Sequence, residues 1–492
     1  MIQIRLNEDN FQYDIYSLTK AFFPEEEIET IIDAKEQQKA EKSTRVLKIS
    51  YVSQQVIIAY VPAIDTENFA QRVFAWESQE RKQQKNQLKA ALYDLLCQIS
   101  GKTLPWGNLT GIRPIKIVMG MLEQGMNEEK AAGEMMKIYC ISREKADLSL
   151  EIAKRQLAVL DTFSYGDGYS LYVGIPFCPT TCLYCSFTSY PIGLWQEKTG
   201  EYLQALFQEL EYISKRMKGK TLDSIYIGGG TPTTLSPREL ELLLRKIRKL
   251  FDCKDVKEFC VEAGRPDSIT KEKLKVLKEC GVERISINPQ TMNEETLKVI
   301  GRHHSVSDIR RTFELAREVG FSTINMDIIL GLPGEGMEHL QHTLNEIEQM
   351  KPENLTIHSL ALKRAARLNL QKDYYADRVN AAPVHMMQEA ERRARTMGLV
   401  PYYLYRQKNM GGNLENVGYA REGHIGLYNI LIMEERQTII AAGAGAMSKL
   451  VSPGGNITRI ENVKDVTNYI QRVQEMIARK EEVFGSNDIE IC

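Results

Sequence analysis

The sequence predicts an α/β protein whose centre is a partial (β/α)6 TIM-like barrel, with an N-terminal α+β module before it and a C-terminal α+β region after it. Between residues 171 and 362, six strand-like segments alternate with helical segments. Strands that alternate with helices form parallel sheets with the helices outside. A closed barrel needs eight such units, so six units indicate an open, partial barrel.

The six strands are expected where apolar, β-branched runs end in glycine or polar residues. These runs are 171–177, 224–230, 258–264, 284–290, 323–330 and 354–362. The segments between them carry apolar residues at helical spacing. The predicted helices are 199–216, 237–250, 271–280, 307–319 and 337–350. In such a barrel, functional residues gather at the carboxyl ends of the strands.

Residues 1–165 form the predicted N-terminal module, to which the sequence assigns no role. Its expected strands are 1–6, 45–52 and 55–61, its first long helix is 83–100, and further helices fill 115–160. A loop rich in glycine and proline, 104–114, separates these helices, and its simplest interpretation is a loop packed between secondary-structure elements. The glycines in 165–168 indicate a hinge, so the barrel is expected over 166–366.

Residues 367–492 form the predicted C-terminal region, interpreted as a substrate cover or accessory part. A helix is expected at 381–397, strands at 402–405 and 437–442, and a terminal helix at 463–478. The polar tail 485–492 is expected to fray.

The composition is that of an ordinary globular protein and excludes several classes of function. A net charge of −2 gives no basic field for nucleic acid. The nine cysteines in 492 residues are too sparse for a disulfide framework. The N-terminal residues lack the pattern of a signal peptide, and no apolar run reaches membrane length. We therefore expect a cytoplasmic protein that binds neither nucleic acid nor membrane and is a monomer.

The first chemical motif is a cysteine triplet, Cys178, Cys182 and Cys185, which follows the first barrel strand. Structural zinc sites take four ligands, so a zinc site would need a distant histidine; buried free thiols are another alternative. Three thiolates suit a [4Fe–4S] cluster and leave its fourth iron open to a substrate or cofactor. Aromatic neighbours, including Tyr184 and Phe187, would exclude water from it.

Glycine or polar residues also stand at or near the ends of the next four strands. The second strand ends in the glycine run 228–230, which lets a ligand approach the backbone closely. The third ends near Glu262, an acceptor for a ribose or an ammonium group. Gln290 ends the fourth strand, and Arg302 follows after a short helix; Arg can pair bidentately with a carboxylate. Asp327 is an acid within the apolar fifth strand, where it needs a partner.

This ordered set of motifs resembles the radical S-adenosylmethionine (SAM) enzymes. The stretch Tyr172-Val173-Gly174-Ile175-Pro176-Phe177-Cys178 is similar to the YxHIPFC opening of the oxygen-independent coproporphyrinogen III oxidase family. The GGGTPT segment and the D-x-x-x-G-L-P segment at Asp327 also match that family. The N-terminal module, with its PWGNLTGIRP loop, looks like the HemZ branch. The resemblance covers roughly residues 170–450.

The resemblance implies a [4Fe–4S] cluster on the three cysteines and two SAM molecules beside it. Gly229 would contact the cluster-bound SAM, whereas Gly230 and Thr231 would contact the second SAM. Gln290 and Arg302 would also bind the second SAM. Asp327 is the predicted catalytic residue, holding a SAM amino group or pyrrole N–H donors. The full implied set of SAM-binding residues is Tyr172, Tyr184, Gly229, Gly230, Thr231, Glu262, Gln290, Arg302, Asp327, Ala361 and Met447.

The implied reaction belongs to haem biosynthesis. A 5′-deoxyadenosyl radical would abstract a β-hydrogen from each of two propionates of coproporphyrinogen III, and loss of CO2 and one electron from each would leave the vinyl groups of protoporphyrinogen IX. The electron donor would be a small carrier such as flavodoxin or ferredoxin. The protein would supply positioning and exclude water.

Two positions depart from the oxidase pattern and leave alternatives open. The histidine of YxHIPFC is Gly174 here, and the oxidases carry a further cysteine where this chain has Phe187. Cys185-Ser186-Phe187 looks more like the related haem chaperones. The HNxxYW segment of those chaperones is missing, and Tyr428-Asn429 stands near its place. A haem-binding chaperone and a radical enzyme acting on another tetrapyrrole are therefore the alternatives.

Overall fold

The fold is described from a computed structural model of the chain. The described residues are 1–32, 45–62, 69–111, 113–186, 189–361, 368, 384–407, 410–452 and 455–485. They form two compact units. Unit 1 comprises 1–153 and the segment Arg406–Glu415, and unit 2 comprises 154–405 and 416–492.

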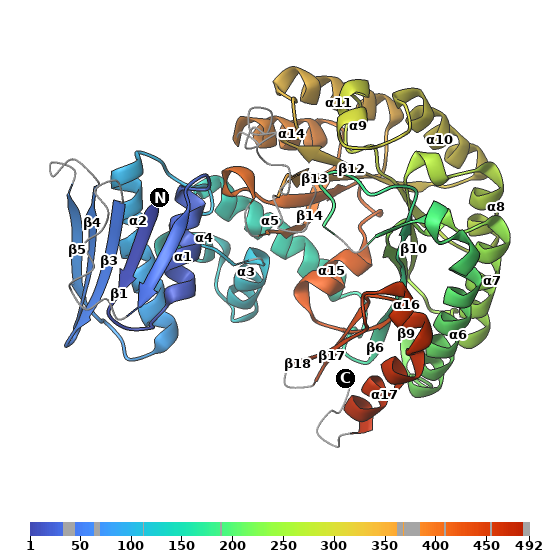
Figure 1. The fold of residues 1–492 in the computed structure, drawn as a ribbon, viewed down its shortest axis with the longest axis horizontal. Coiled ribbons are helices and arrows are strands. Elements are labelled where there is room, and N and C mark those ends of the chain that lie inside the picture. Colours follow the sequence, from blue (N-terminus) through green and yellow to red (C-terminus); the bar gives the residue numbers. More distant parts are fainter. Residues whose placement is uncertain are drawn as a thin grey trace. The chain divides into compact units, whose positions relative to one another are not determined.

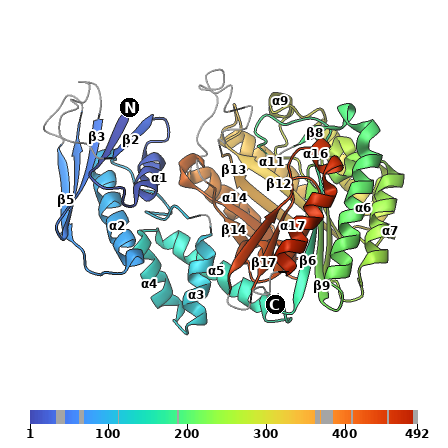
Figure 2. The ribbon, with the colours of Figure 1, turned by 60° about the horizontal axis from the view of Figure 1, so that its bottom comes forward.

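Unit 1 is built on a five-stranded sheet with strand order β2-β1-β3-β4-β5. The strands are β1 (Ile2–Leu6), β2 (Ile28–Ile32), β3 (Arg45–Val52), β4 (Gln55–Val61) and β5 (Ala70–Ala75). β1 lies parallel to β2 and β3, whereas β3, β4 and β5 form an antiparallel meander. Helices α1 (Gln12–Phe22) and α2 (Arg81–Ser100) cover one face, as Figure 2 shows, and share its apolar core. The expected strands 45–52 and 55–61 are confirmed to the residue.

Three further helices complete unit 1: α3 (Pro114–Glu123), α4 (Glu128–Tyr139) and α5 (Arg143–Leu160), whose last residues lie in unit 2. The segment Arg406–Glu415 is held among them by buried polar contacts. The indole N–H of Trp106 donates to Glu415 at 2.6 Å, and the ammonium of Lys145 pairs with the same carboxylate at 2.6 Å. Trp106, within the predicted loop 104–114, is therefore packed between elements of unit 1, as the simplest interpretation of that loop expected.

Unit 2 contains the predicted barrel. Its six core strands are β6 (Gly168–Ile175), β9 (Thr221–Gly229), β10 (Glu258–Gly264), β11 (Arg284–Ile287), β12 (Thr323–Leu330) and β13 (Asn354–Ser359). Each is parallel to the next in this order. The strands expected from sequence are confirmed within about three residues at each end; β11 ends at Ile287 rather than at residue 290, and β13 ends at Ser359 rather than at residue 362. All six carboxyl ends lie at one edge of the sheet.

Helices lie on the outer face of this curved sheet (Figure 1). The long ones are α6 (Thr199–Arg216), α7 (Pro237–Leu250), α8 (Lys271–Glu279), α10 (Val306–Val319) and α11 (Met337–Met350). Each buries an apolar stripe, and α7 and α10 begin with capping boxes at Ser236 and Ser305. The short helix α9 (Glu294–Val299) follows β11. The predicted helices are confirmed within about two residues at each end.

The C-terminal part of unit 2 extends the sheet at both edges, giving eleven strands in the order β14-β15-β13-β12-β11-β10-β9-β6-β16-β17-β18. The added strands are β14 (Val400–Tyr405), β15 (Asn416–Ala420), β16 (Thr438–Ala442), β17 (Met447–Val451) and β18 (Ile457–Glu461). β16 is parallel to β6, which makes a seventh parallel strand. The sequence predicted three regions, whereas the structure groups the barrel with the C-terminal strands because the two share backbone hydrogen bonds.

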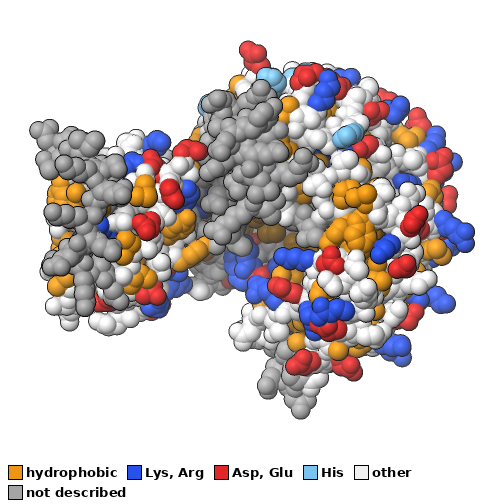
Figure 3. Space-filling view, viewed as in Figure 1, with side chains coloured by type: hydrophobic (Ala, Val, Ile, Leu, Met, Phe, Trp, Pro, Cys, Tyr) orange, Lys and Arg blue, Asp and Glu red, His pale blue; other side chains and the backbone are white. Residues whose placement is uncertain are grey.

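Helices α14 (Val384–Thr396), α15 (Leu427–Glu434), α16 (Val466–Gln471) and α17 (Val473–Gly485) complete this part. The helix expected at 463–478 is thus two helices; the expected helical residues 381–383 and the tail 486–492 lie outside the described residues. Among the helices that the structure describes, none combines the length and the hydropathy that a membrane span requires. On the face of unit 2 in Figure 3, acidic and basic side chains are mixed.

Candidate functional site

The cysteine triplet lies in a loop that leaves β6 at the carboxyl edge of the sheet. Cys178 ends the two-residue strand β7 (Phe177–Cys178), which pairs with β8 (Tyr190–Pro191). The N–H of Leu183 donates to the carbonyl of Ile300 at 3.0 Å, and the Thr180 hydroxyl donates to the carbonyl of Gly301 at 3.1 Å. The loop is therefore fixed to the turn that follows α9, immediately before Arg302.

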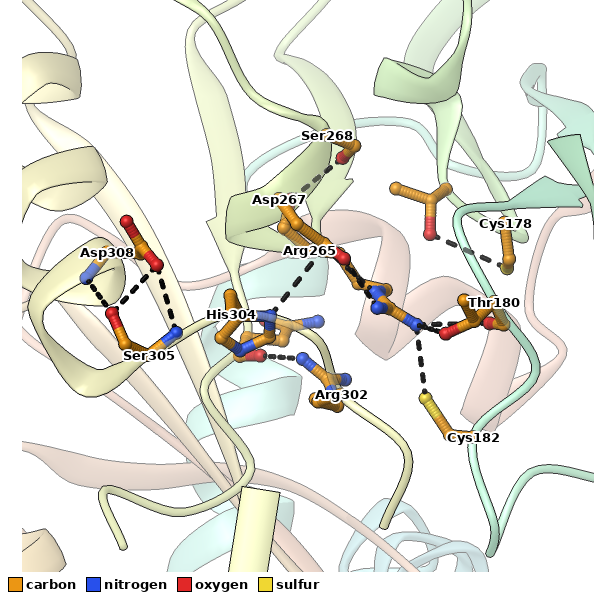
Figure 4. A network of polar contacts seen from close by, with 12 residues as sticks. Cys178, Thr180, Cys182, Arg265, Asp267, Ser268, Arg302, His304, Ser305 and Asp308 are labelled. Atoms are coloured by element: carbon orange, nitrogen blue, oxygen red, sulfur yellow. Dashed lines mark hydrogen bonds and ion pairs between the residues drawn. The ribbon is translucent and has the colours of Figure 1, made fainter. Parts of the chain in front are cut away.

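Two polar side chains donate to the cysteine sulfurs. The hydroxyl of Thr231 donates to Sγ of Cys178 at 3.5 Å, and Nη1 of Arg265 donates to Sγ of Cys182 at 3.6 Å (Figure 4). Burial raises the pKa of the Cys178 thiol to about 11, against the lowering effect of the Thr231 hydrogen bond. Bound iron would replace the thiol proton, because thiolates are the ligands of iron–sulfur clusters.

The glycine run at the end of β9 brings the backbone against the cysteine loop. The N–H of Gly230 donates to the carbonyl of Ile175 at 2.7 Å, and the N–H of Thr231 donates to the carbonyl of Phe177 at 2.6 Å. A Cβ atom at residue 230 would lie only 2.5 Å from the Phe177 oxygen. Gly229 has a φ of +105°, a conformation that side-chain-bearing residues rarely adopt. Glycine is therefore required here for close approach.

Glu262, at the end of β10, lies beside this glycine run. Its carboxylate accepts from the Tyr226 hydroxyl at 2.5 Å and from the Gly229 N–H at 3.3 Å. The rings of Tyr226 and Tyr428 stack with centroids 4.3 Å apart, and Tyr172 stacks against both at 6.2 Å. Burial raises the pKa of Glu262 to about 7, and the negative charge of Asp327 adds to this rise.

Gln290 and Arg302 are both buried at the carboxyl end of β11. Gln290 has a φ of +67°, in the left-handed region that glycine or asparagine usually occupies. Arg302 donates to the carbonyl of Asn288 at 2.5 Å and to the Tyr184 hydroxyl at 3.1 Å. Within the described residues, its buried Nε has no hydrogen-bond partner. An orphaned guanidinium N–H is what an incoming carboxylate would satisfy.

Asp327 is the centre of a polar group inside the barrel. Asn325 donates to it at 2.8 Å, and Nε2 of His358 lies 3.8 Å away. On the far side of that ring, Nδ1 of His358 lies 3.3 Å from the Tyr405 hydroxyl. Burial opposes ionisation of Asp327, yet the hydrogen bonds from His358 and Asn325 lower its pKa. Its side chain is 21% exposed, so this ionised acid faces the opening of the barrel (the mouth) at the carboxyl ends of the strands.

The remaining predicted residues lie at the periphery. Ala361 is two residues beyond β13, and Met447 begins β17, two strands from β6 and 37% exposed. Phe187 lies outside the described residues. The structure thus places eleven of the predicted cofactor and metal residues along the carboxyl ends of β6, β9, β10, β11 and β12 or in the loops that follow, whereas Tyr172 lies within β6. The eleven are Cys178, Cys182, Tyr184, Cys185, Gly229, Gly230, Thr231, Glu262, Gln290, Arg302 and Asp327.

Sequence reasoning missed four side chains of this site: Tyr226, Arg265, His358 and Tyr428. Tyr226 alternates with buried residues in β9 and so could have been read as barrel-facing. Arg265 stands directly after β10, where a charged residue at a strand end indicates function. His358 is the penultimate residue of β13, near the same edge of the sheet. Tyr428 reaches the site from α15, far away in sequence; the sequence placed it near the chaperones' HNxxYW position but did not predict its contacts with Tyr172 and Tyr226.

These residues fit the cluster and SAM in their chemistry. Four features lie at one edge of the sheet: the three cysteine thiols, the two donors to their sulfurs, the glycine run 228–230 (the glycine cradle) and the unpaired Nε–H of Arg302. Among the described residues, no three Cys, His, Asp or Glu side chains are grouped closely enough to hold one metal ion. The fit therefore rests on the donors to the sulfurs and on the cradle.

Comparison with known proteins identifies the family. The model of the Radical SAM superfamily matches residues 172–347. The oxygen-independent coproporphyrinogen-III oxidase-like protein HemZ of Bacillus subtilis is 44% identical over 417 residues, 83% of each chain. The heme chaperone HemW of the same organism is 36% identical over 308 residues, 62% of this chain and 76% of its own.

A solved structure agrees at the level of the fold. Coproporphyrinogen III oxidase (HemN) from Escherichia coli, described as a radical SAM enzyme, aligns over 65% of this chain and 72% of its own, with a TM-score of 0.53 and 24% identity. The radical SAM domain implies a [4Fe–4S] cluster and SAM as cofactors. From its identity over most of both lengths, the chain belongs to the family of the radical SAM, oxygen-independent coproporphyrinogen-III oxidase-like protein HemZ.

Proposed function

We propose that this protein catalyses the oxygen-independent oxidative decarboxylation of coproporphyrinogen III to protoporphyrinogen IX. The observation that carries the proposal is the convergence of three thiols, a glycine cradle, Glu262, Gln290, Arg302 and Asp327 on one sheet edge. The names of the relatives HemZ and HemN supply the substrate. We infer a cytoplasmic monomer that receives electrons from a small carrier such as flavodoxin or ferredoxin.

Cys178, Cys182 and Cys185 would hold the cluster, and Gly229 and Glu262 would hold the first SAM. When bound, these cofactors supply a carbon-centred radical that removes hydrogen from the substrate. Glu262 offers an acceptor for a ribose hydroxyl or an ammonium group. The stacked rings of Tyr172, Tyr226 and Tyr428 form an apolar wall behind that carboxylate, and this wall excludes water.

Gly230, Thr231, Gln290 and Arg302 would hold a second SAM. The orphaned Nε of Arg302 suits the methionyl carboxylate, which can pair with the guanidinium plane. Tyr184 orients that plane through its hydroxyl, 3.1 Å from Nη2. Ala361 and Met447 would complete the SAM contacts from the edges of the site.

Asp327 would orient the substrate. Its lowered pKa keeps it an acceptor at neutral pH, and the carboxylate is open to the mouth. Pyrrole N–H groups of a porphyrinogen are donors, so an ionised acid is a suitable partner for them. His358 lies beside Asp327 and is itself held by the Tyr405 hydroxyl, so the two side chains fix the orientation of the carboxylate.

The test is anaerobic incubation of the reconstituted protein with SAM, a reductant and coproporphyrinogen III. We expect harderoporphyrinogen-type monovinyl and then divinyl products, together with one 5′-deoxyadenosine and one CO2 for each propionate lost. Absence of vinyl products with intact SAM cleavage would reject this substrate.

A haem chaperone is the second candidate function, favoured by the 36% identity to HemW and by Cys185-Ser186-Phe187. The residue nearest the chaperone's HNxxYW place, Tyr428, is buried and stacked on Tyr226, so it is not presented to a haem. Tight stoichiometric haem binding without vinyl formation would favour the chaperone. SAM cleavage that depends on a different tetrapyrrole would favour an enzyme acting on that molecule.

A further inference from the structure

Arg265 occupies a position that none of the assigned roles uses. It follows β10 directly and is only 3% exposed. Its Nη1 donates to the carbonyl of Thr180 at 3.0 Å, to the hydroxyl of Thr180 at 2.7 Å and to Sγ of Cys182 at 3.6 Å. One guanidinium nitrogen thus contacts both the backbone of the cysteine loop and one of its sulfurs (Figure 4).

The other two nitrogens of Arg265 are held by Asp267. Nε donates to Oδ1 at 3.0 Å and Nη2 donates to Oδ2 at 2.6 Å, which is a bidentate pair. Asp267 is itself contacted by Nδ1 of His304 at 3.6 Å, and the His304 ring is buried. The guanidinium plane is therefore fixed, and its remaining nitrogen, Nη1, points to the cysteine loop.

From this geometry we propose that Arg265 is a positioning and redox-tuning residue for the cluster: its N–H donor and positive charge at Cys182 raise the cluster's reduction potential, and Asp267 sets the size of that effect. The inference rests on the assignment of Cys178, Cys182 and Cys185 as cluster ligands.

The physical basis is the charge of the cluster. Reduction adds one electron from an external donor to the cluster, with no atoms transferred, and so makes it more negative. Hydrogen bonds to the sulfurs and nearby positive charge stabilise the more negative state, and burial strengthens both effects. Removing the guanidinium should therefore make reduction harder, whereas removing the Asp267 charge should make it easier.

The experiment is an EPR-monitored redox titration with dithionite of anaerobically reconstituted full-length protein, after iron and sulfide have been counted. For Arg265→Gln we expect at least a tenfold lower ratio of reduced to oxidised cluster at a fixed potential, about 59 mV for a one-electron couple. Asp267→Asn should shift the ratio in the opposite direction. Arg265→Lys, which keeps the charge, should lie closer to wild type than Arg265→Gln.

The matched control is Arg317→Gln, which removes a half-buried arginine paired with Glu353 at 2.8 Å on the outer helix α10. It should leave the potential unchanged. Equal potentials for wild type, Arg265→Gln and Asp267→Asn would overturn the inference while leaving the cluster assignment intact. If Arg265→Gln lost its cluster, the upward shift in Asp267→Asn would decide the question. A wild-type protein that binds no cluster would overturn both the assignment and the inference.

Discussion

The backbone N–H of Gln290 donates a hydrogen bond to the carbonyl oxygen of Asp327 at 2.9 Å. In return, the carbonyl of Gln290 accepts from the N–H of Ile329 at 3.0 Å. This pair of bonds continues the parallel pairing of β11 with β12 past the end of β11 at Ile287. Between them the chain turns through the φ of +67° at Gln290. The left-handed turn thus places the Gln290 side chain and Asp327 at the same sheet edge.

Replacing Gln290 by glycine should separate stability from ligand binding. Glycine adopts a positive φ without strain, which offsets the lost side-chain contacts, so the free energy of unfolding should change by no more than about 1 kcal/mol. Equilibrium dialysis with labelled SAM should show the bound ratio falling from two to one per chain. Gln290→Asn, which keeps the amide and tolerates this φ, is the control. An unchanged ratio in Gln290→Gly would remove Gln290 from the second SAM site.

Gly230→Ala should damage both the cradle and the cysteine loop. The new methyl group would stand 2.5 Å from the Phe177 carbonyl oxygen, so the backbone must shift and the hydrogen bond from Thr231 to that oxygen must weaken. We expect a loss of about 1–3 kcal/mol in unfolding free energy, as for other overpacked sites, and weaker SAM binding. Gly193→Ala, where nothing lies within 4 Å, is the matched control and should be neutral. Equal effects of the two substitutions would contradict the requirement for glycine at residue 230.

Cys182→Ala should abolish the cluster and all SAM cleavage, because two thiolates cannot hold three irons. Iron and sulfide content, the visible absorption of the cluster and 5′-deoxyadenosine formation are the readouts. Cys280→Ala removes a buried thiol at the end of α8, outside the site, and should retain all three. SAM cleavage retained in Cys182→Ala would refute the cluster assignment.

Glu262 should make stability depend on pH. Its pKa is raised from 4.5 to about 7, so between these values the folded protein binds a proton that the unfolded chain has lost. Stability should therefore fall as pH rises from 4.5 to 7 and then level off, with Glu262 contributing at most about 3 kcal/mol of that change. Urea unfolding from pH 5 to 8 should show a smaller fall for Glu262→Gln than for wild type. Identical pH dependences would mean that the Glu262 carboxyl is not shifted.

The same titration should appear in SAM binding. A carboxylate accepts hydrogen bonds that the protonated acid cannot, so SAM affinity should rise as pH increases through about 7. In Glu262→Gln the affinity should be lower and should not change with pH over this range. A wild-type affinity that falls over the same range would contradict the acceptor role.

The barrel could be predicted because each of its strands and helices is marked by a short, continuous stretch of sequence. Apolar runs such as 323–330, closed by glycine or polar residues, and amphipathic helices such as 237–250 each mark one element, and right-handed β-α alternation fixes their order. Since the carboxyl ends of parallel strands meet at one edge, Glu262 and Asp327 could be brought together from sequence alone.

The C-terminal strands could not be placed in this way. β16 pairs with β6 across more than 260 residues, as in Ala441 opposite Tyr172, and nothing local marks that partner. Likewise, nothing local in the sequence shows that Tyr428, from α15, stacks against Tyr172 and Tyr226 beside Glu262. The hydrogen bond from Arg265 to Cys182 also escaped prediction, because a charged residue after a strand does not reveal which loop it contacts. Long-range pairing and side-chain direction are thus what the sequence patterns leave open.

The most direct test of the account follows one hydrogen atom. Reconstituted, reduced protein is incubated with SAM and coproporphyrinogen III deuterated at the propionate β-carbons, and the 5′-deoxyadenosine is examined by mass spectrometry. We predict one deuterium in each 5′-deoxyadenosine and one vinyl group for each molecule formed, with both lost in Cys182→Ala. Unlabelled 5′-deoxyadenosine without vinyl product, from protein with a complete cluster, would contradict the proposed reaction.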